Sequence, residues 1–328
     1  MVAALRIVFI WLLLFGFPVG AQEAAAADLD RLRAALATVR FVAYTPRDFR
    51  PWQGATVSPA QIDADLALIR PSFDGLITYS TEKGLAAVPE LAAARGFNAL
   101  ILGVWNPRDA KEIEQAIDLC RRFPILIVGV ALGNEGVVAE RYGWPDVAEA
   151  LNRVRRDLPH MPLTTSEPFG ILLASPPPLL ERLDFFLPNI HPLSEPWFAT
   201  APEAAASQMV VDVANRMRQF GKPILIKETG LPSGPPSAGL TPERQIRFWR
   251  TFFAALKTGP AFAVAAFEAF DAPWKPAEMA RHFDTVMAGE AHWGFFTADS
   301  QPKPVLGAWL EAVARAGKRR RGDQRRTS

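Results

Sequence analysis

Eight short apolar runs recur along the chain and constrain its fold more than any other feature. They are rich in Val, Ile, Leu and Phe and lie at 41–45, 76–79, 99–104, 125–132, 162–165, 185–190, 224–226 and 264–270. Because these runs are continuously apolar rather than alternating with polar residues, they indicate strands buried on both faces, as in a parallel sheet. Segments with helical periodicity lie between them, and two begin with a capping residue followed by proline, at Ser58-Pro59 and Thr241-Pro242.

This alternation predicts an α/β protein whose residues 40–316 form a single (β/α)₈ TIM barrel. An open, doubly wound sheet is the less favoured arrangement. No Gly-x-Gly-x-x-Gly follows the first run, and no phosphate-binding loop ending in Gly-Lys-Ser/Thr occurs anywhere. We therefore expect no nucleotide or other cofactor.

The two ends of the chain differ from the barrel region. Arg6 precedes an apolar run at 7–19 that is shorter than the ~20 residues of a membrane-spanning helix, and small residues follow up to Ala21. We expect residues 1–21 to be a signal peptide, so that the protein is exported to the periplasm or the extracellular space; an uncleaved segment would anchor it to the membrane. Residues 22–39 are expected to form a helical extension, and residues 317–328 a disordered basic tail.

Charge and histidine spacing exclude several classes of partner. The chain carries 36 Lys and Arg against 34 Asp and Glu, and six of these cations lie in the tail from Lys318 onward, with Asp323 as its single acid. The rest of the chain is therefore slightly acidic, which argues against nucleic-acid binding. The basic tail is the segment that would associate peripherally with a membrane or envelope. The four histidines share no ligand spacing, so we expect no catalytic metal. We expect a monomer.

Two of the apolar runs end in carboxylates. Residues 125–133 lead into Asn134-Glu135, and residues 223–227 lead into Glu228-Thr229-Gly230. Barrel active sites form at the carboxyl ends of the strands, and the fourth and seventh strands lie on roughly opposite sides of the mouth. Two facing carboxylates suit glycosidic bond cleavage, in which one acid protonates the leaving oxygen and one ionised group attacks or activates water. The alternative is that each glutamate ends its strand in a structural ion pair.

These segments resemble a known family. Gly133-Asn134-Glu135 and residues 227–233, Lys-Glu-Thr-Gly-Leu-Pro-Ser, are similar to the two signature segments of glycoside hydrolase family 17, the β-1,3-glucanase family. Further segments agree in order and spacing at 44–46, 77–80, 162–167, 267–275 and 293–296, so the resemblance covers about residues 40–305. It implies a (β/α)₈ fold and net retention of anomeric configuration, with Glu135 as general acid/base, Glu228 as nucleophile and Asn134 bonding the sugar 2-hydroxyl.

The chain departs from the family pattern at four positions, namely Leu193, Lys227, Leu231 and Ala272. The family usually has an aromatic residue, a small residue or glycine, Trp and Glu at these places, respectively. The catalytic pair is kept, so we expect the departures to affect substrate positioning, and with it the accepted chain length or linkage.

Other residues at predicted strand ends and loops are candidates for substrate binding. Loop tryptophans suit stacking on sugar rings, with ordinary packing as the alternative. The two tyrosines that end the first two strands either bond the catalytic carboxylates or cap the core, and the histidine either bonds near Glu228 or is structural. An aspartate and a lysine after the eighth run are expected to shape the donor subsite. The candidates are Tyr44, Tyr79, Trp105, His191, Trp197, Asp271, Trp274 and Lys275.

The resemblance and the carboxylate pair together predict a retaining endo- or exo-β-1,3-glucanase that acts through a covalent glycosyl-enzyme on a β-glucan oligosaccharide or polysaccharide. Such an enzyme would serve glucan degradation or remodelling of envelope glucan. One alternative is a β-1,3-glucanosyltransferase, including one that forms β-1,6 branches. The other is a non-catalytic glycan-binding barrel, against which the two desolvated carboxylates argue.

Overall fold

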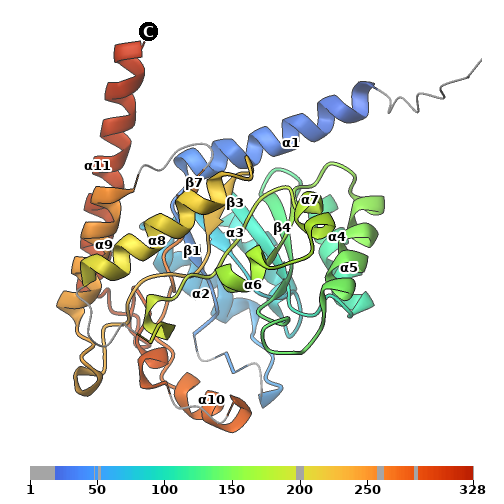
Figure 1. Cartoon of the computed structure of the whole chain (residues 1–328). Coiled ribbons are helices and arrows are strands. Elements are labelled where there is room, and N and C mark those ends of the chain that lie inside the picture. The colour runs from blue at the N-terminus through green and yellow to red at the C-terminus, as the bar shows by residue number, and fades with distance from the viewer. Residues whose placement is uncertain are drawn as a thin grey trace, which may run out of the picture.

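The computed structural model describes residues 19–327, apart from 48, 51–52, 197–202, 257–261 and 284–286. Parallel strands lie at the centre and helices surround them (Figure 1). The strands are β1 (Phe41–Ala43), β2 (Gly75–Ile77), β3 (Ala99–Val104), β4 (Ile127–Asn134), β5 (Leu163–Ser166), β6 (Ile224–Ile226) and β7 (Phe262–Val264). The first five form one sheet in sequential order, and β6 pairs with β7.

Single bridges connect the two sheets on both sides. Val42 of β1 pairs with Ala266 just after β7, and the Ala43 N–H donates to the Ala266 carbonyl at 2.9 Å. On the other side, Phe186 pairs with Ile224 of β6, and Asn189 pairs with Pro168 after β5. Eight segments therefore surround one interior, which is the predicted (β/α)₈ barrel.

The sixth and eighth segments differ from the prediction in extent. Residues 185–190 join their neighbours through isolated bridges instead of a continuous ladder, because Pro188 has no N–H to donate within the run. The last strand begins earlier than expected, at Phe262, and only single pairings follow it as far as Phe270.

The helices alternate with the strands as expected, and local capping begins several of them. The Ser58 side chain accepts the Gln61 N–H in a capping box before α2, and Thr241 accepts the Arg244 N–H before α9. The bounds are α1 (Val19–Thr38), α2 (Pro59–Ile69), α3 (Val88–Ala94), α4 (Ala110–Arg122), α5 (Trp144–Asp157), α6 (Phe169–Leu173), α7 (Pro177–Arg182), α8 (Glu203–Arg218), α9 (Pro242–Ala255), α10 (Lys275–Phe283) and α11 (Pro304–Thr327). Short 3₁₀ turns lie at Leu85–Ala87, Pro192–Ser194, Pro236–Ala238 and Ala288–Ala291.

The barrel interior is closed at its amino-terminal end by α1. Leu32 and Leu36 of this helix pack with inward-facing strand residues such as Phe41 and Leu225. The Arg31 guanidinium lies 3.4 Å from the carbonyl of Ile127, where β4 begins. Figure 1 shows α1 crossing this end of the barrel. The carboxyl ends of the strands lie at the opposite end, which we call the mouth.

The two ends of the chain lie partly outside the described residues. The apolar run that predicts a signal peptide lies, apart from Val19, outside the described residues. Helix α11 continues to Thr327, so residues 317–327 are helical in this structure, where a disordered tail was expected; Ala, Lys and Arg are strong helix formers and extend a helix whose first turns are packed. Among the described helices, none combines the length and apolarity needed to cross a bilayer.

Candidate active site

The turn that follows β4 places Glu135 at the barrel mouth. Gly133 and Glu135 have positive φ values of 96° and 48°, and the Glu135 N–H donates to the Ser166 carbonyl at 2.8 Å. A Cβ at Gly133 would lie 2.3 Å from the hydroxyl oxygen of Tyr142, so only glycine permits this close packing. The glycine before Asn134-Glu135 is therefore required by the shape of the turn.

The buried carboxylate of Glu167, which directly follows β5, supports this turn. Glu167 is fully buried, and its carboxylate accepts the N–H groups of Val137 at 2.9 Å and Val138 at 3.3 Å. The Arg141 guanidinium donates to the carbonyl of Asn134. Two side chains, Glu167 and Arg141, thus hold the backbone on either side of Glu135.

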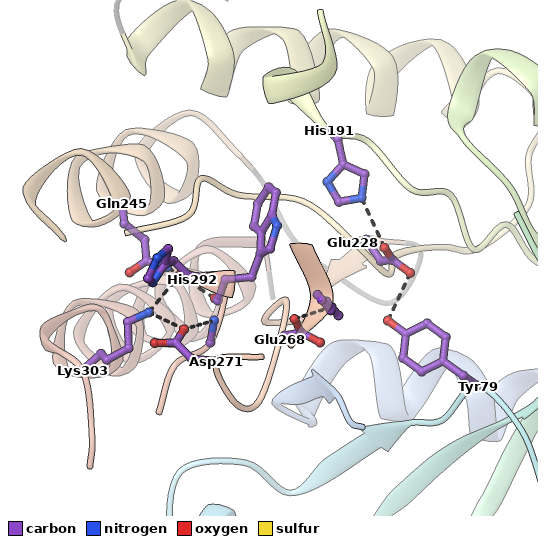
Figure 2. Close-up of polar contacts among 11 residues, drawn as sticks. Tyr79, His191, Glu228, Gln245, Glu268, Asp271, His292 and Lys303 are labelled. Carbon is purple, nitrogen blue, oxygen red and sulfur yellow. Dashed lines mark hydrogen bonds and ion pairs between the residues drawn. The ribbon is translucent and has the colours of Figure 1, made fainter. Parts of the chain in front are cut away.

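Glu228 follows β6 and is surrounded by hydrogen-bond donors. The Tyr79 hydroxyl donates to Glu228 Oε1 at 3.1 Å, and His191 Nε2 lies 3.2 Å from Oε2 (Figure 2). The ammonium of the preceding Lys227 lies 3.0 Å from Oε1. Glu228 itself is 5% exposed, so these partners replace the water that the carboxylate loses on burial.

The two predicted carboxylates face each other. Oxygens of Glu135 and Glu228 and a ring nitrogen of His191 all lie within 4.8 Å of one another. Asn189 donates its side-chain N–H to Glu135 Oε1 at 2.8 Å and so orients that carboxyl group. A pair this close matches the spacing of about 5–5.5 Å at which one carboxylate attacks a sugar directly, and is shorter than the spacing of about 6.5–9.5 Å that leaves room for an attacking water beside the sugar.

Their surroundings push the two pKa values apart. Burial raises the pKa of Glu135, and the negative charge of Glu228 adds to this effect. Burial also opposes ionisation of Glu228, but the charge of Lys227 and the hydrogen bond and charge of His191 outweigh it and lower the pKa to about 2. The site therefore contains one carboxyl group whose pKa is raised beside one whose pKa is lowered.

Glu135, His191 and Glu228 also have the composition of a small metal site. Two contacts oppose that interpretation: the Lys227 ammonium already lies against Glu228 Oε1, and the Asn189 amide donates to Glu135. A metal cation bound at Glu228 Oε1 would have to share this oxygen with the positive charge of Lys227. The donor set therefore fits an acid–base pair, and the absence of a catalytic metal stays a prediction.

A third carboxylate lies next to this pair. Glu268 is 3% exposed and contacts the ammonium of Lys275. Burial raises the pKa of Glu268 to about 7 even though Lys275 opposes this shift. Lys275 thus pairs with a carboxylate at the mouth, while its ammonium lies 5.4 Å from the ring centre of Phe267.

Asp271 has a supporting position beside that pair. Its Oδ1 accepts the Gly294 N–H at 2.8 Å and the Lys303 ammonium at 2.7 Å (Figure 2). Asp271 and Trp274, together with Glu268, also line a narrow pocket. Asp271 and Trp274 therefore both lie next to the mouth, and Asp271 already accepts hydrogen bonds from two donors.

Trp105 lies on the rim and is held by a buried acid that the sequence reasoning did not single out. Glu112 accepts the backbone N–H groups of Trp105 at 2.9 Å and Asn106 at 3.0 Å, and also that of Thr81 at 3.2 Å. The Arg141 guanidinium carbon lies 4.2 Å from the centre of the Trp105 ring. The loops after β2 and β3 are thereby joined through one carboxylate.

The remaining candidates have different outcomes. The Tyr44 hydroxyl donates to Asp65 at 3.2 Å, so Tyr44 caps the core and contacts neither catalytic candidate, unlike Tyr79. Trp197 lies outside the described residues. The structure adds Asn189 and Lys227 as direct contacts of the two carboxylates. In the sequence, each of these two residues is polar and lies at or next to the end of an apolar run, and this pattern could have identified both.

Comparisons with known proteins relate this chain to glycoside hydrolases. Residues 42–294 match the family model described as the BtgE/BtgC glycoside hydrolase domain. A curated glucan 1,3-beta-glucosidase of Arthroderma benhamiae is 26% identical over 235 residues, which cover 65% of this chain and 72% of that protein.

Solved structures share the fold. A Rhizomucor miehei beta-1,3-glucanosyltransferase, solved as an active-site mutant with laminaritriose, has a TM-score of 0.64 at 17% identity, covering 81% of this chain and 96% of its own. An endo-laminarinase from Formosa has a TM-score of 0.61 at 20% identity, covering 83% and 86%. The resemblance to a family 17-like group of enzymes, stated from the sequence motifs, is confirmed at this level.

Proposed function

Because the chain belongs to the family of BtgE/BtgC glycoside hydrolase domains, and is thus an O-glycosyl hydrolase, we propose that it cleaves β-1,3-glucan with retention of anomeric configuration. The observation that carries the proposal is the facing pair Glu135 and Glu228, no more than 4.8 Å apart and with pKa values shifted in opposite directions. A retaining glycosidase requires this combination of spacing and protonation.

The reaction follows from these two groups. Ionised Glu228 attacks the anomeric carbon, while Glu135 donates its proton to the departing glycosidic oxygen. This forms a covalent glycosyl-enzyme through a Glu228 oxygen and releases the aglycone alcohol. Glu135, now ionised, takes a proton from water as the water attacks the anomeric carbon, and Glu228 departs as a carboxylate.

Neighbouring side chains serve this sequence. Tyr79 and His191 hold the two Glu228 oxygens, so that the attacking oxygen is oriented before substrate arrives. Asn189 orients Glu135. Asn134, next to Glu135, is placed to bond the sugar 2-hydroxyl, an interaction that strengthens as the ring flattens toward the transition state.

The choice of β-1,3-glucan is supported by the relatives. The curated relative is named for action on β-1,3-glucan, and the solved structure from Rhizomucor miehei contains laminaritriose. These relatives differ in the reaction for which they are named, since they include a glucosidase, a laminarinase and a glucanosyltransferase. Hydrolysis is the simplest outcome of a covalent intermediate at an open barrel mouth, and transfer to an acceptor sugar would use the same intermediate.

The proposal is tested by incubating the purified protein with reduced laminari-oligosaccharides and following products by mass and, for stereochemistry, by proton NMR. We expect shorter products that first appear as the β-anomer. Glu228→Gln and Glu135→Gln are expected to abolish turnover of this substrate. Glu203→Gln, which loses ion pairs to Arg244 and Arg247 instead of a contact with either candidate, is the matched control.

Other results would contradict parts of the proposal. Longer products would assign a transferase, and a first-formed α-anomer would overturn retention. Retained turnover in Glu228→Gln would remove the nucleophile assignment. Binding of the oligosaccharide without any turnover would leave a glycan-binding barrel.

We also propose that the protein acts after export, on glucan of the envelope or outside the cell. The support is the charged, apolar and small-residue pattern of residues 1–21. Cell fractionation with amino-terminal sequencing tests this proposal; a protein found in the cytoplasm would contradict it.

A further inference from the structure

Lys227 is an unusual residue for its position. It directly follows β6, and its side chain is only 2% exposed. Leu225, two residues earlier, packs in the cluster that fills the barrel interior, and the period-two alternation of a strand places Lys227 on the same inner side. A buried ammonium is costly unless its partners compensate for the lost hydration.

The partners of this ammonium are groups of the active site. It lies 3.0 Å from Glu228 Oε1, donates a hydrogen bond to Asn134 Oδ1, and lies 4.5 Å from the centre of the Tyr79 ring. These residues follow β6, end β4 and follow β2, respectively. One cation therefore joins three strand ends that are far apart in sequence.

The contact with Asn134 determines which way its amide faces. A lysine ammonium has only donors, so the amide must present its oxygen to Lys227 and direct its NH₂ group elsewhere. The NH₂ group is then the end of Asn134 available to a sugar hydroxyl. Without the ammonium, the amide could rotate and present its oxygen instead.

The contact with Glu228 acts on the same oxygen that Tyr79 holds. Both donors meet Oε1, and His191 holds Oε2, so the carboxylate is fixed at both oxygens. The charge of Lys227 is also the largest influence that favours the ionised form of Glu228.

We propose that Lys227 is a positioning residue, whose buried ammonium holds the Glu228 carboxylate for attack and turns the Asn134 amide so that its NH₂ group meets the substrate. The catalytic part of this inference rests on the proposed function. Lys222 provides the contrast of a structural lysine: its ammonium donates to the backbone carbonyls of Leu180 at 2.7 Å and Glu181 at 2.9 Å.

The first test measures Glu228 directly and needs no substrate. Protein labelled with ¹³C at the glutamate carboxyl carbon is titrated by NMR, with Glu228→Gln identifying the Glu228 signal. We expect Glu228 to stay ionised down to pH values well below the usual 4.5 in the wild type. In Lys227→Met we expect its midpoint to rise by at least about one pH unit, while Lys222→Met leaves it unchanged.

The same experiment contains the results that would overturn the proposal. A Lys227→Met protein whose Glu228 titrates as in the wild type would do so. If Lys227→Met does not fold, Lys227→Gln, which also removes the charge but keeps a polar side chain, decides in its place: an unchanged Glu228 midpoint in that variant would overturn the proposal.

The second test separates positioning from packing by kinetics. In Lys227→Met we expect kcat on a laminari-oligosaccharide to fall at least tenfold and the acid limb of kcat/KM to move upward with the NMR midpoint. Lys227→Arg keeps the cation and should retain the acid limb. An unchanged kcat and acid limb in Lys227→Met would overturn the proposal, whereas a wild type inactive on every β-1,3-glucan refutes the proposed substrate and leaves the NMR titration to decide on Lys227.

Discussion

The two tyrosines that end the first two strands offer a sharp test of the site, because the same small change has different expected effects. Tyr79→Phe removes one oxygen, the donor that lies 3.1 Å from Glu228 Oε1. Tyr44→Phe removes the donor that lies 3.2 Å from Asp65 Oδ2. Both side chains follow the carboxyl ends of neighbouring strands, so they form a matched pair.

The size of the effect follows from the bond that is lost. A hydrogen bond to a charged group contributes about 1.5–3 kcal/mol. If the bond aligns the nucleophile throughout the reaction, its loss lowers kcat/KM by roughly 10- to 100-fold, at 1.36 kcal/mol for each factor of ten. Lys227 and His191 still contact Glu228, so we expect the loss to lie near the lower end of that range.

The assay is steady-state hydrolysis of a reduced laminari-oligosaccharide, with thermal unfolding measured in parallel. Tyr79→Phe should lose activity mainly in kcat, and its acid limb should move upward, because a donor to the ionised form of Glu228 is gone. Tyr44→Phe should keep wild-type kinetics and lose about 1.5–3 kcal/mol of stability, because its bond is also to a carboxylate. The reasoning is refuted if Tyr79→Phe stays within about threefold of the wild type, or if Tyr44→Phe loses as much activity.

Three further predictions concern the carboxylates. The pKa of Glu135 is raised, and its acid form is lost as the pH rises through that pKa, so kcat/KM should fall on the alkaline side. Glu135→Gln should lack this alkaline limb when it is assayed with an aryl glycoside whose leaving group needs no proton. The lowered pKa of Glu228 stabilises the fold above the unfolded value near 4.5, and this contribution should be lost as pH falls toward about 2; thermal unfolding of Glu228→Gln should show a weaker dependence on pH in this interval. Glu112→Gln places an NH₂ group against the backbone donors of the rim, and we expect a loss of about 1–3 kcal/mol in the free energy of unfolding, measured by urea titration; an unchanged midpoint would contradict the joining role of Glu112.

The amino-acid sequence by itself determined the class of fold and the choice of the two candidate carboxylates. Continuous apolar runs indicate buried parallel strands wherever they occur, because burial on both faces excludes polar residues locally. Glu135 and Glu228 stand out for the same reason, since each is a charged residue directly after such a run. These signals are local, and so they can be read without knowing which strands are neighbours.

Only the tertiary structure decided what meets at the mouth. That Tyr79 contacts Glu228 while Tyr44 contacts Asp65 depends on where each strand end lies in the closed barrel. The inward position of Lys227 and the bond from Asn189 to Glu135 likewise join residues from different strands. Such contacts depend on strand register and on the turn at each strand end, which arise from packing across the whole barrel. The pKa difference between the two carboxylates arises from burial and from the charges of Lys227 and His191 against Glu228, and so the proposed roles of acid and nucleophile depend on the fold.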